Sequence, residues 1–266
     1  MPTPVQELLR VGDLERSPQR KKLQTSFDEA ALAQFNERCV HELFELEAAQ
    51  CPDTLALTYG DQRFTYRELN EKANQLAHFL IRFGVGPNSL VGLCVHRTPE
   101  MVIGILGILK AGGAYVPMDP LWSKQRLALT IDDSNIFVLL TQSALLDRLP
   151  RHNGPRLSLD GNREIIAKER KTNPRARATP RNLAYSIYSS SFGESKGVRI
   201  SHRGLLNYLS WGVEAFQVAK GAEPALDSTI SLDLAITRAL SLLMFGRSIS
   251  LGNKGSYEAP EPSYAV

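Results

Sequence analysis

The sequence predicts an α/β fold built on mostly parallel sheets. Short apolar runs such as 90–95 and 136–141 are typical of buried strands, and segments with apolar residues at helical spacing lie between such runs. This alternation indicates a parallel sheet, because each parallel neighbour needs a crossover connection. With 266 residues, 43% of them hydrophobic, the chain can bury a large core and is too apolar to be wholly disordered.

The first elements follow a polar leader over residues 1–36. Apolar residues from Val40 to Ala48 recur at helical spacing and predict a helix. Residues 54–59 alternate and end at a Gly-Asp turn signal. The segment 63–66 is therefore expected to return as the second strand of a hairpin.

Two helices carry clear start signals. Thr65 and Glu68 form a capping box, in which each side chain accepts a hydrogen bond from the backbone N–H of the other residue, and Gly84 ends that helix. Residues 98–100 supply a cap, a proline at the first helical position and an acid near the positive end of the helix. We expect this second helix to end at Lys110, a structural cation near the helix C-terminus.

The alternation continues along the chain. A strand over 114–116, closed by Pro117, should be followed by a helix over 124–132. Further strands are expected over 136–141, 156–159, 183–188 and 197–201.

The net charge of +3 comes from one local stretch. Residues 148–181 hold ten basic and three acidic side chains, a net of +7, which leaves −4 for the rest of the chain. The stretch has no Phe, Tyr or Trp on which bases could stack, and Pro, Gly and Asn interrupt it. We interpret it as a solvated loop with a short helix, and expect no nucleic-acid partner.

Several classes of protein are excluded. The longest apolar run, including Gly, is nine residues, whereas a membrane span needs about 20, so no membrane association is expected. The cysteines Cys39, Cys51 and Cys94 are odd in number and lack CxxC spacing, which argues against disulfides and zinc sites. We therefore assign no metal ligand and expect reduced thiols in a cytoplasmic protein.

The segment 182–202 is the most informative for chemistry. A buried strand leads into a loop rich in hydroxyl side chains and Gly, with Lys196 near its end. Hydroxyls, exposed backbone N–H groups and a cation suit a polyphosphate, although a plain hairpin loop would also fit these residues.

Four segments, in order, resemble the core motifs of adenylation domains of nonribosomal peptide synthetases. They are 64–69 (FTYREL), 109–120 (LKAGGAYVPMDP), 182–202 with the phosphate loop, and 228–247 with Leu232-Asp233-Leu234-Ala235. The resemblance covers residues 37–252 and implies the adenylate-forming fold of helix-flanked, mostly parallel sheets. We expect its N-terminal portion with an incomplete second sheet, no C-terminal lid domain, and a disordered tail over 253–266.

The resemblance implies a reaction and its partners. Members join a carboxylate to ATP with Mg²⁺, giving an acyl-adenylate and pyrophosphate, and peptide synthetases pass an amino acid to a carrier protein. Residues that match the phosphate loop are Ser189, Ser190, Gly193, Lys196 and Gly197. Asp233 matches the acid that pairs with the substrate ammonium, and an N-cap is its competing interpretation. His202 matches a common His that we interpret as structural.

The sequence departs from the family pattern. Phe192 occupies the place of two hydroxyl residues, so the loop is one residue short, and Ser191 and Ser195 replace Gly and Pro. The later motifs, which supply adenine, magnesium and ribose contacts and a catalytic Lys, are not found, so we assign no catalytic residue. We expect an adenylation fragment, inactive or impaired alone. A docking module for a fuller synthetase and an acyl or aryl acid ligase fragment are the alternatives.

Overall fold

The structure of the protein, a computed structural model, describes residues 37–189, 196–215, 225–226 and 232–252. The leader over 1–36 and the tail over 253–266, both expected from the sequence, lie outside the described residues.

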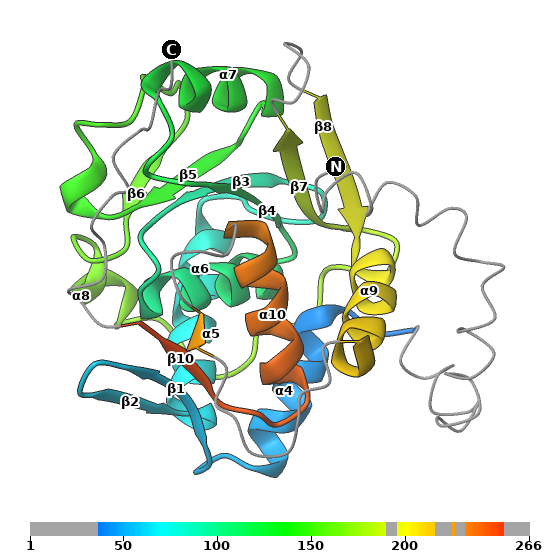
Figure 1. The fold of residues 1–266 in the computed structure, drawn as a ribbon. Coiled ribbons are helices and arrows are strands. Elements are labelled where there is room, and N and C mark those ends of the chain that lie inside the picture. The colour runs from blue at the N-terminus through cyan, green and yellow to red at the C-terminus, as the bar shows by residue number, and fades with distance from the viewer. Residues whose placement is uncertain (1–36, 190–195, 216–224, 227–231, 253–266) are drawn as a thin grey trace, which may run out of the picture. The chain divides into compact units, whose positions relative to one another are not determined.

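A six-stranded sheet, in the order β6-β5-β3-β4-β7-β8, is the larger of two (Figure 1). Neighbouring strands are parallel except β7 and β8, which form an antiparallel hairpin. The strands are β3 (Leu90–Cys94), β4 (Ala114–Met118), β5 (Val138–Thr141), β6 (Arg156–Ser158), β7 (Leu183–Ser189) and β8 (Lys196–Ser201). The predicted parallel α/β architecture is confirmed.

A four-stranded sheet in the order β2-β1-β10-β9 joins the two ends of the described chain. The predicted hairpin is β1 (Leu55–Tyr59) with β2 (Gln62–Thr65), and β1 also pairs in parallel with β10 (Ile249–Leu251). Beside β10 lies the short strand β9 (Ala225–Leu226).

Helices fill the space between the two sheets and cover the outer face of the larger one (Figure 1). Between them, α5 (Tyr66–Arg82) packs on β1 and β2, α6 (Pro99–Lys110) packs on β3 and β4, and α10 (Leu232–Met244) reaches from β4 to β10. The outer helix α7 (Lys124–Ser134) covers β4. Helices α4 (Val40–Gln50) and α9 (His202–Ala215) pack against each other and against α10.

Helix starts follow the sequence signals in part. At α5 the capping box is confirmed: Thr65 N donates to Glu68 Oε2 at 2.9 Å and Glu68 N donates to Thr65 Oγ1 at 3.2 Å. At α6 the predicted start is confirmed, with Thr98 as the N-cap and Pro99 as the first helical residue, but the Thr98 hydroxyl donates to Glu100 Oε2 at 2.5 Å and makes no capping bond to a backbone N–H.

One strand boundary also differs. We expected Pro117 to close its strand, but β4 continues through it to Met118. Proline lacks the N–H that a central strand needs. The register of β4 with β7 is a single pair, Tyr115 with Tyr185, so β4 is no longer paired with β7 at the proline.

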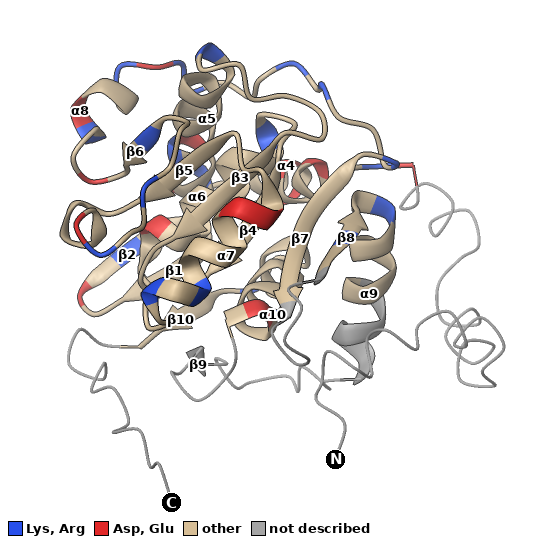
Figure 2. Cartoon of the chain, turned by 90° about the horizontal axis from the view of Figure 1, so that it is seen from above, with Lys and Arg blue, Asp and Glu red and all other residues tan. Residues whose placement is uncertain are grey.

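The basic stretch contains the strand β6 and the expected short helix, α8 (Arg163–Ile166), and most of its other residues are exposed. Two of its charged residues form ion pairs with α5: Glu169 with Arg82 at 2.5 Å and Lys171 with Glu71 at 2.8 Å. Figure 2 shows acidic and basic positions interleaved around α8 and α5. Among the described residues, no helix is both long and apolar enough to cross a membrane.

Candidate functional site

The hairpin of β7 and β8 carries the predicted phosphate loop. Its last backbone pair joins Ser189 to Lys196, so these two residues face each other across the mouth of the loop. Ser190 and Gly193, also predicted to bind phosphate, lie outside the described residues. The structure therefore brings together one hydroxyl residue and the lysine, and leaves the middle of the loop undescribed.

Gly197, the fifth predicted phosphate-loop residue, has a clear packing role. A Cβ at this position would lie 2.6 Å from the ring of Tyr188, its cross-strand partner. Tyr188 is buried and its hydroxyl lies 3.5 Å from the carbonyl oxygen of Asp133 at the end of α7. Gly197 thus makes room for the ring that anchors the hairpin to the core.

Asp233 lies in the first turn of α10. The helix begins at Leu232, so Asp233 is inside the helix and the predicted N-cap role does not fit. The Thr237 hydroxyl donates to the Asp233 carbonyl oxygen at 2.8 Å, a bond within the helix that does not involve the carboxylate. The half-buried carboxylate is thus placed at the positive end of a helix, where an acid is stabilised.

The charge of Asp233 acts on three tyrosines, Tyr115, Tyr185 and Tyr208. Tyr115 on β4 and Tyr185 on β7 stack with ring centroids 5.4 Å apart and planes inclined by 12°. Burial, then the other tyrosine, then the charge of Asp233 raise the pKa of Tyr115 well above its ordinary value. Burial first and Asp233 second raise the pKa of Tyr208 on α9. The acid therefore acts electrostatically on phenols contributed by the neighbouring strands β4 and β7 and by helix α9.

One strand links the two halves of the candidate site. Tyr185, beside Asp233, and Ser189, at the mouth of the hairpin, are four residues apart on β7. At about 3.3 Å for each strand residue, their Cα atoms are about 13 Å apart. This spacing is comparable to an extended molecule with an ammonium group at one end and phosphates at the other.

Lys110, which the sequence assigns a structural role, is buried at the end of α6. Its ammonium forms an ion pair with Glu45 of α4, donates to Asn173 Oδ1 at 3.3 Å and lies 5.9 Å from the Phe44 ring centroid. Burial lowers the pKa of Lys110 to about 8, although Glu45 opposes that change. The structural interpretation holds, with a carboxylate as the partner instead of the helix carbonyls.

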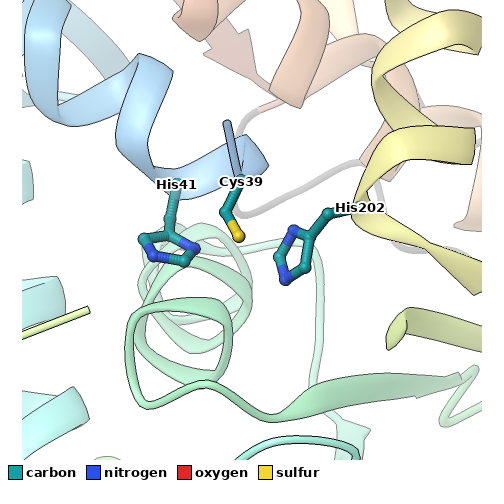
Figure 3. Close-up of side chains that lie close together, drawn as sticks. All are labelled: Cys39, His41 and His202. Carbon is teal, nitrogen blue, oxygen red and sulfur yellow. The ribbon is translucent and has the colours of Figure 1, made fainter. Parts of the chain in front are cut away.

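A second group of reactive side chains was missed from the sequence. Cys39, His41 and His202 lie together at the starts of α4 and α9 (Figure 3). The Cys-x-His spacing was the available signal, but His202 is far away in the chain and only the fold brings it to the other two.

Comparisons with known proteins agree with this geometry. The AMP-binding enzyme family matches residues 44–253. The chain is 42% identical over 237 residues to one of the linear gramicidin synthase proteins of Brevibacillus parabrevis, covering 89% of this chain and 5% of that protein. It is also 42% identical over 207 residues to tyrocidine synthase 3 of the same organism, covering 76% and 3%.

Solved structures show the same fold. A variant of the nonribosomal peptide synthetase FmoA3 superposes with a TM-score of 0.74 at 27% identity, over 85% of this chain and 24% of that one. The N-terminal subdomain of Klebsiella oxytoca NpsA gives a TM-score of 0.70 at 22% identity, over 81% and 55%. The chain thus spans a small part of the curated relatives it matches. It belongs to the AMP-binding enzyme family and resembles the adenylation domains of nonribosomal peptide synthetases.

Proposed function

We propose that this chain is the N-terminal portion of an amino-acid-activating adenylation domain that serves nonribosomal peptide assembly. Its reaction joins the carboxylate of an amino acid to ATP in the presence of Mg²⁺, releases pyrophosphate, and prepares the aminoacyl group for a carrier protein. The family match and the peptide synthetase relatives support this assignment. FmoA3 itself has been crystallised with AMPPNP and with α-methyl-L-serine-AMP.

The observation that carries the proposal is the position of Asp233. A carboxylate whose charge acts on Tyr115, Tyr185 and Tyr208 suits the α-ammonium of an amino acid, because opposite charges pair and aromatic rings attract cations. An acyl or aryl acid has no ammonium and would leave this acid unmatched. An amino-acid substrate is therefore favoured over the acyl or aryl acid of a ligase fragment.

The nucleotide end of the site is expected to be weaker. Ser189 and Lys196 at the mouth of the hairpin have the donor chemistry that a phosphate needs, so the residues fit ATP. Bound ATP would supply the activated phosphorus that the substrate carboxylate attacks. However, the loop sequence places Phe192 where relatives have two hydroxyl residues, and catalysis of this kind depends on positioned donors. We infer that the chain alone binds ATP weakly and turns over little or none.

Two measurements test the proposal. In the first, the chain is screened by thermal unfolding against each proteinogenic amino acid in turn. One or a few should raise the Tm, and Asp233→Asn should remove that rise while Asp61→Asn, an exposed acid in the β1–β2 turn, keeps it. A rise that survives Asp233→Asn would refute the assigned role of this acid.

The second measurement is amino-acid-dependent exchange of pyrophosphate into ATP. We expect exchange at or near background for the chain alone, and rapid exchange would overturn the inference of an impaired phosphate loop. Co-purification with a fuller synthetase without any amino-acid binding would instead support a docking role.

A further inference from the structure

The starts of two helices bring three metal-binding side chains into one buried cluster. Cys39 precedes α4, His41 lies in its first turn, and His202 is the first residue of α9. One ligand atom from each lies within 4.8 Å of the other two. The side chains are 1%, 3% and 0% exposed, and Figure 3 shows the cysteine sulfur between the two imidazole rings.

An unpartnered nitrogen of His41 in this cluster points to a missing ligand. His41 Nδ1 and His202 Nε2 are buried without a hydrogen-bond partner. Buried polar atoms of native proteins are paired with few exceptions, since leaving one unpaired costs about 1–3 kcal/mol. A ligand held by His41 Nδ1 would remove part of that cost.

The tautomer of His202 leaves a lone pair on the cysteine side of its ring. Val40 N donates to His202 Nδ1 at 3.2 Å, so the ring proton of His202 is on Nε2 and its lone pair is at Nδ1. Because Val40 directly follows Cys39, this lone pair lies beside the cysteine. A metal at Nδ1 would replace a long hydrogen bond from a first-turn amide, a group that helices leave without a backbone acceptor.

We propose that Cys39, His41 and His202 form a binding site for a thiophilic transition-metal ion, with Zn²⁺ as the first candidate. One thiolate and two imidazoles are ligands that Zn²⁺ prefers. Bond lengths of about 2.3 Å to sulfur and 2.0 Å to nitrogen place tetrahedral ligand atoms roughly 3.3–3.6 Å apart. The ligand atoms, now within 4.8 Å of one another, must therefore approach by up to about 1.5 Å.

Binding exchanges a proton for the metal. The S–H bond of Cys39 breaks, the sulfur keeps the electron pair and bonds to Zn²⁺, and the proton leaves to solvent. The pKa of this thiol is raised to about 12 by burial first and then by Glu42 and Glu45. The same carboxylates favour a cation at the sulfur, whereas Lys110 on α6, which faces His41, opposes it.

Cobalt titration tests this site, because Co²⁺ takes zinc positions and reports thiolate ligation by colour. The full chain, freed of metal with a chelator and exchanged into buffer, is titrated with Co²⁺ near neutral pH. We expect a thiolate-to-cobalt charge-transfer band that saturates at one equivalent and is lost when Zn²⁺ is added. The absence of this band in the unaltered chain would overturn the proposal without any variant.

Cysteine variants assign the band to one thiol. Cys39→Ala should abolish it, and His41→Gln should weaken Co²⁺ binding at least tenfold. Cys94→Ala removes a thiol that is equally buried, with its pKa also raised to about 12, and Cys51→Ala removes an exposed one. Both controls should keep the band. A band that survives Cys39→Ala, or that disappears with Cys51→Ala, would place the metal elsewhere and refute the site.

Discussion

Acid should destabilise this fold through His202. Burial lowers the pKa of this imidazole from 6.5 to about 4. Between these values the unfolded chain binds a proton that the folded chain does not, so stability falls as the pH drops from 6.5 to 4. The difference, at about 1.4 kcal/mol for each pH unit, corresponds to about 3 kcal/mol. His41, whose pKa burial also lowers, adds to the loss.

The assay is urea unfolding at pH 7 and at pH 4, with a chelator present so that no metal contributes. The chain with His202→Gln, which does not titrate, should lose about 3 kcal/mol less than the unaltered chain between the two pH values. His78→Gln on α5, where the imidazole is only partly buried and contacts the Thr172 carbonyl oxygen, serves as the control and should keep the full acid loss. Equal acid losses in the His202→Gln and unaltered chains would refute the reasoning.

Three further changes test the packing around the helices, each by chemical denaturation. Tyr66→Phe removes a hydroxyl that lies 2.9 Å from two carbonyl oxygens at the end of α10, and should lower the free energy of unfolding by about 1–2 kcal/mol. An unchanged free energy would contradict a stabilising hydrogen bond from this hydroxyl. Lys110→Met leaves the Glu45 carboxylate without its ion-pair partner and should lower the free energy of unfolding by about 3 kcal/mol. Adding Glu45→Gln to the same chain should restore part of that loss. If the losses of the two single variants simply add in the double variant, the two residues are not coupled. Gly107→Ala puts a Cβ 2.7 Å from Leu76 where α5 and α6 touch, so a loss of about 1–2 kcal/mol is expected, and a gain in stability would show that Leu76 can move.

The order and type of the described elements could be predicted well from the sequence, because local signals carried them. The helix from Pro99 to Lys110 has the predicted bounds, and the Thr65 capping box forms as expected. Prediction was less successful where a partner from elsewhere in the chain decides the outcome. Pro117 stays in its strand because of how β4 meets β7, and α10 starts one residue before the acid that was considered as its cap.

The candidate site, too, could be predicted only in part from the sequence. The order of the motifs indicated Asp233 and the β7–β8 hairpin. It did not indicate that the charge of Asp233 would act on three tyrosines. It assigned Gly197 to phosphate approach, whereas the close contact with Tyr188 gives that glycine a packing reason. The cluster at Cys39 could not be predicted, because one of its members comes from a helix that begins 163 residues later.

The amino-acid end and the nucleotide end of the candidate site should therefore lose binding independently of each other. Asp233 and its tyrosines are held by β4, β7, α9 and α10, whereas the phosphate donors depend on a loop beyond the last hairpin pair. Ser189, at the mouth of the hairpin, is about 13 Å along β7 from Tyr185, so a change confined to the loop lies well away from the tyrosine pair. Amino-acid binding should consequently persist in a chain whose nucleotide binding is weak. Loss of both together would indicate that the loop also shapes the pocket around Asp233.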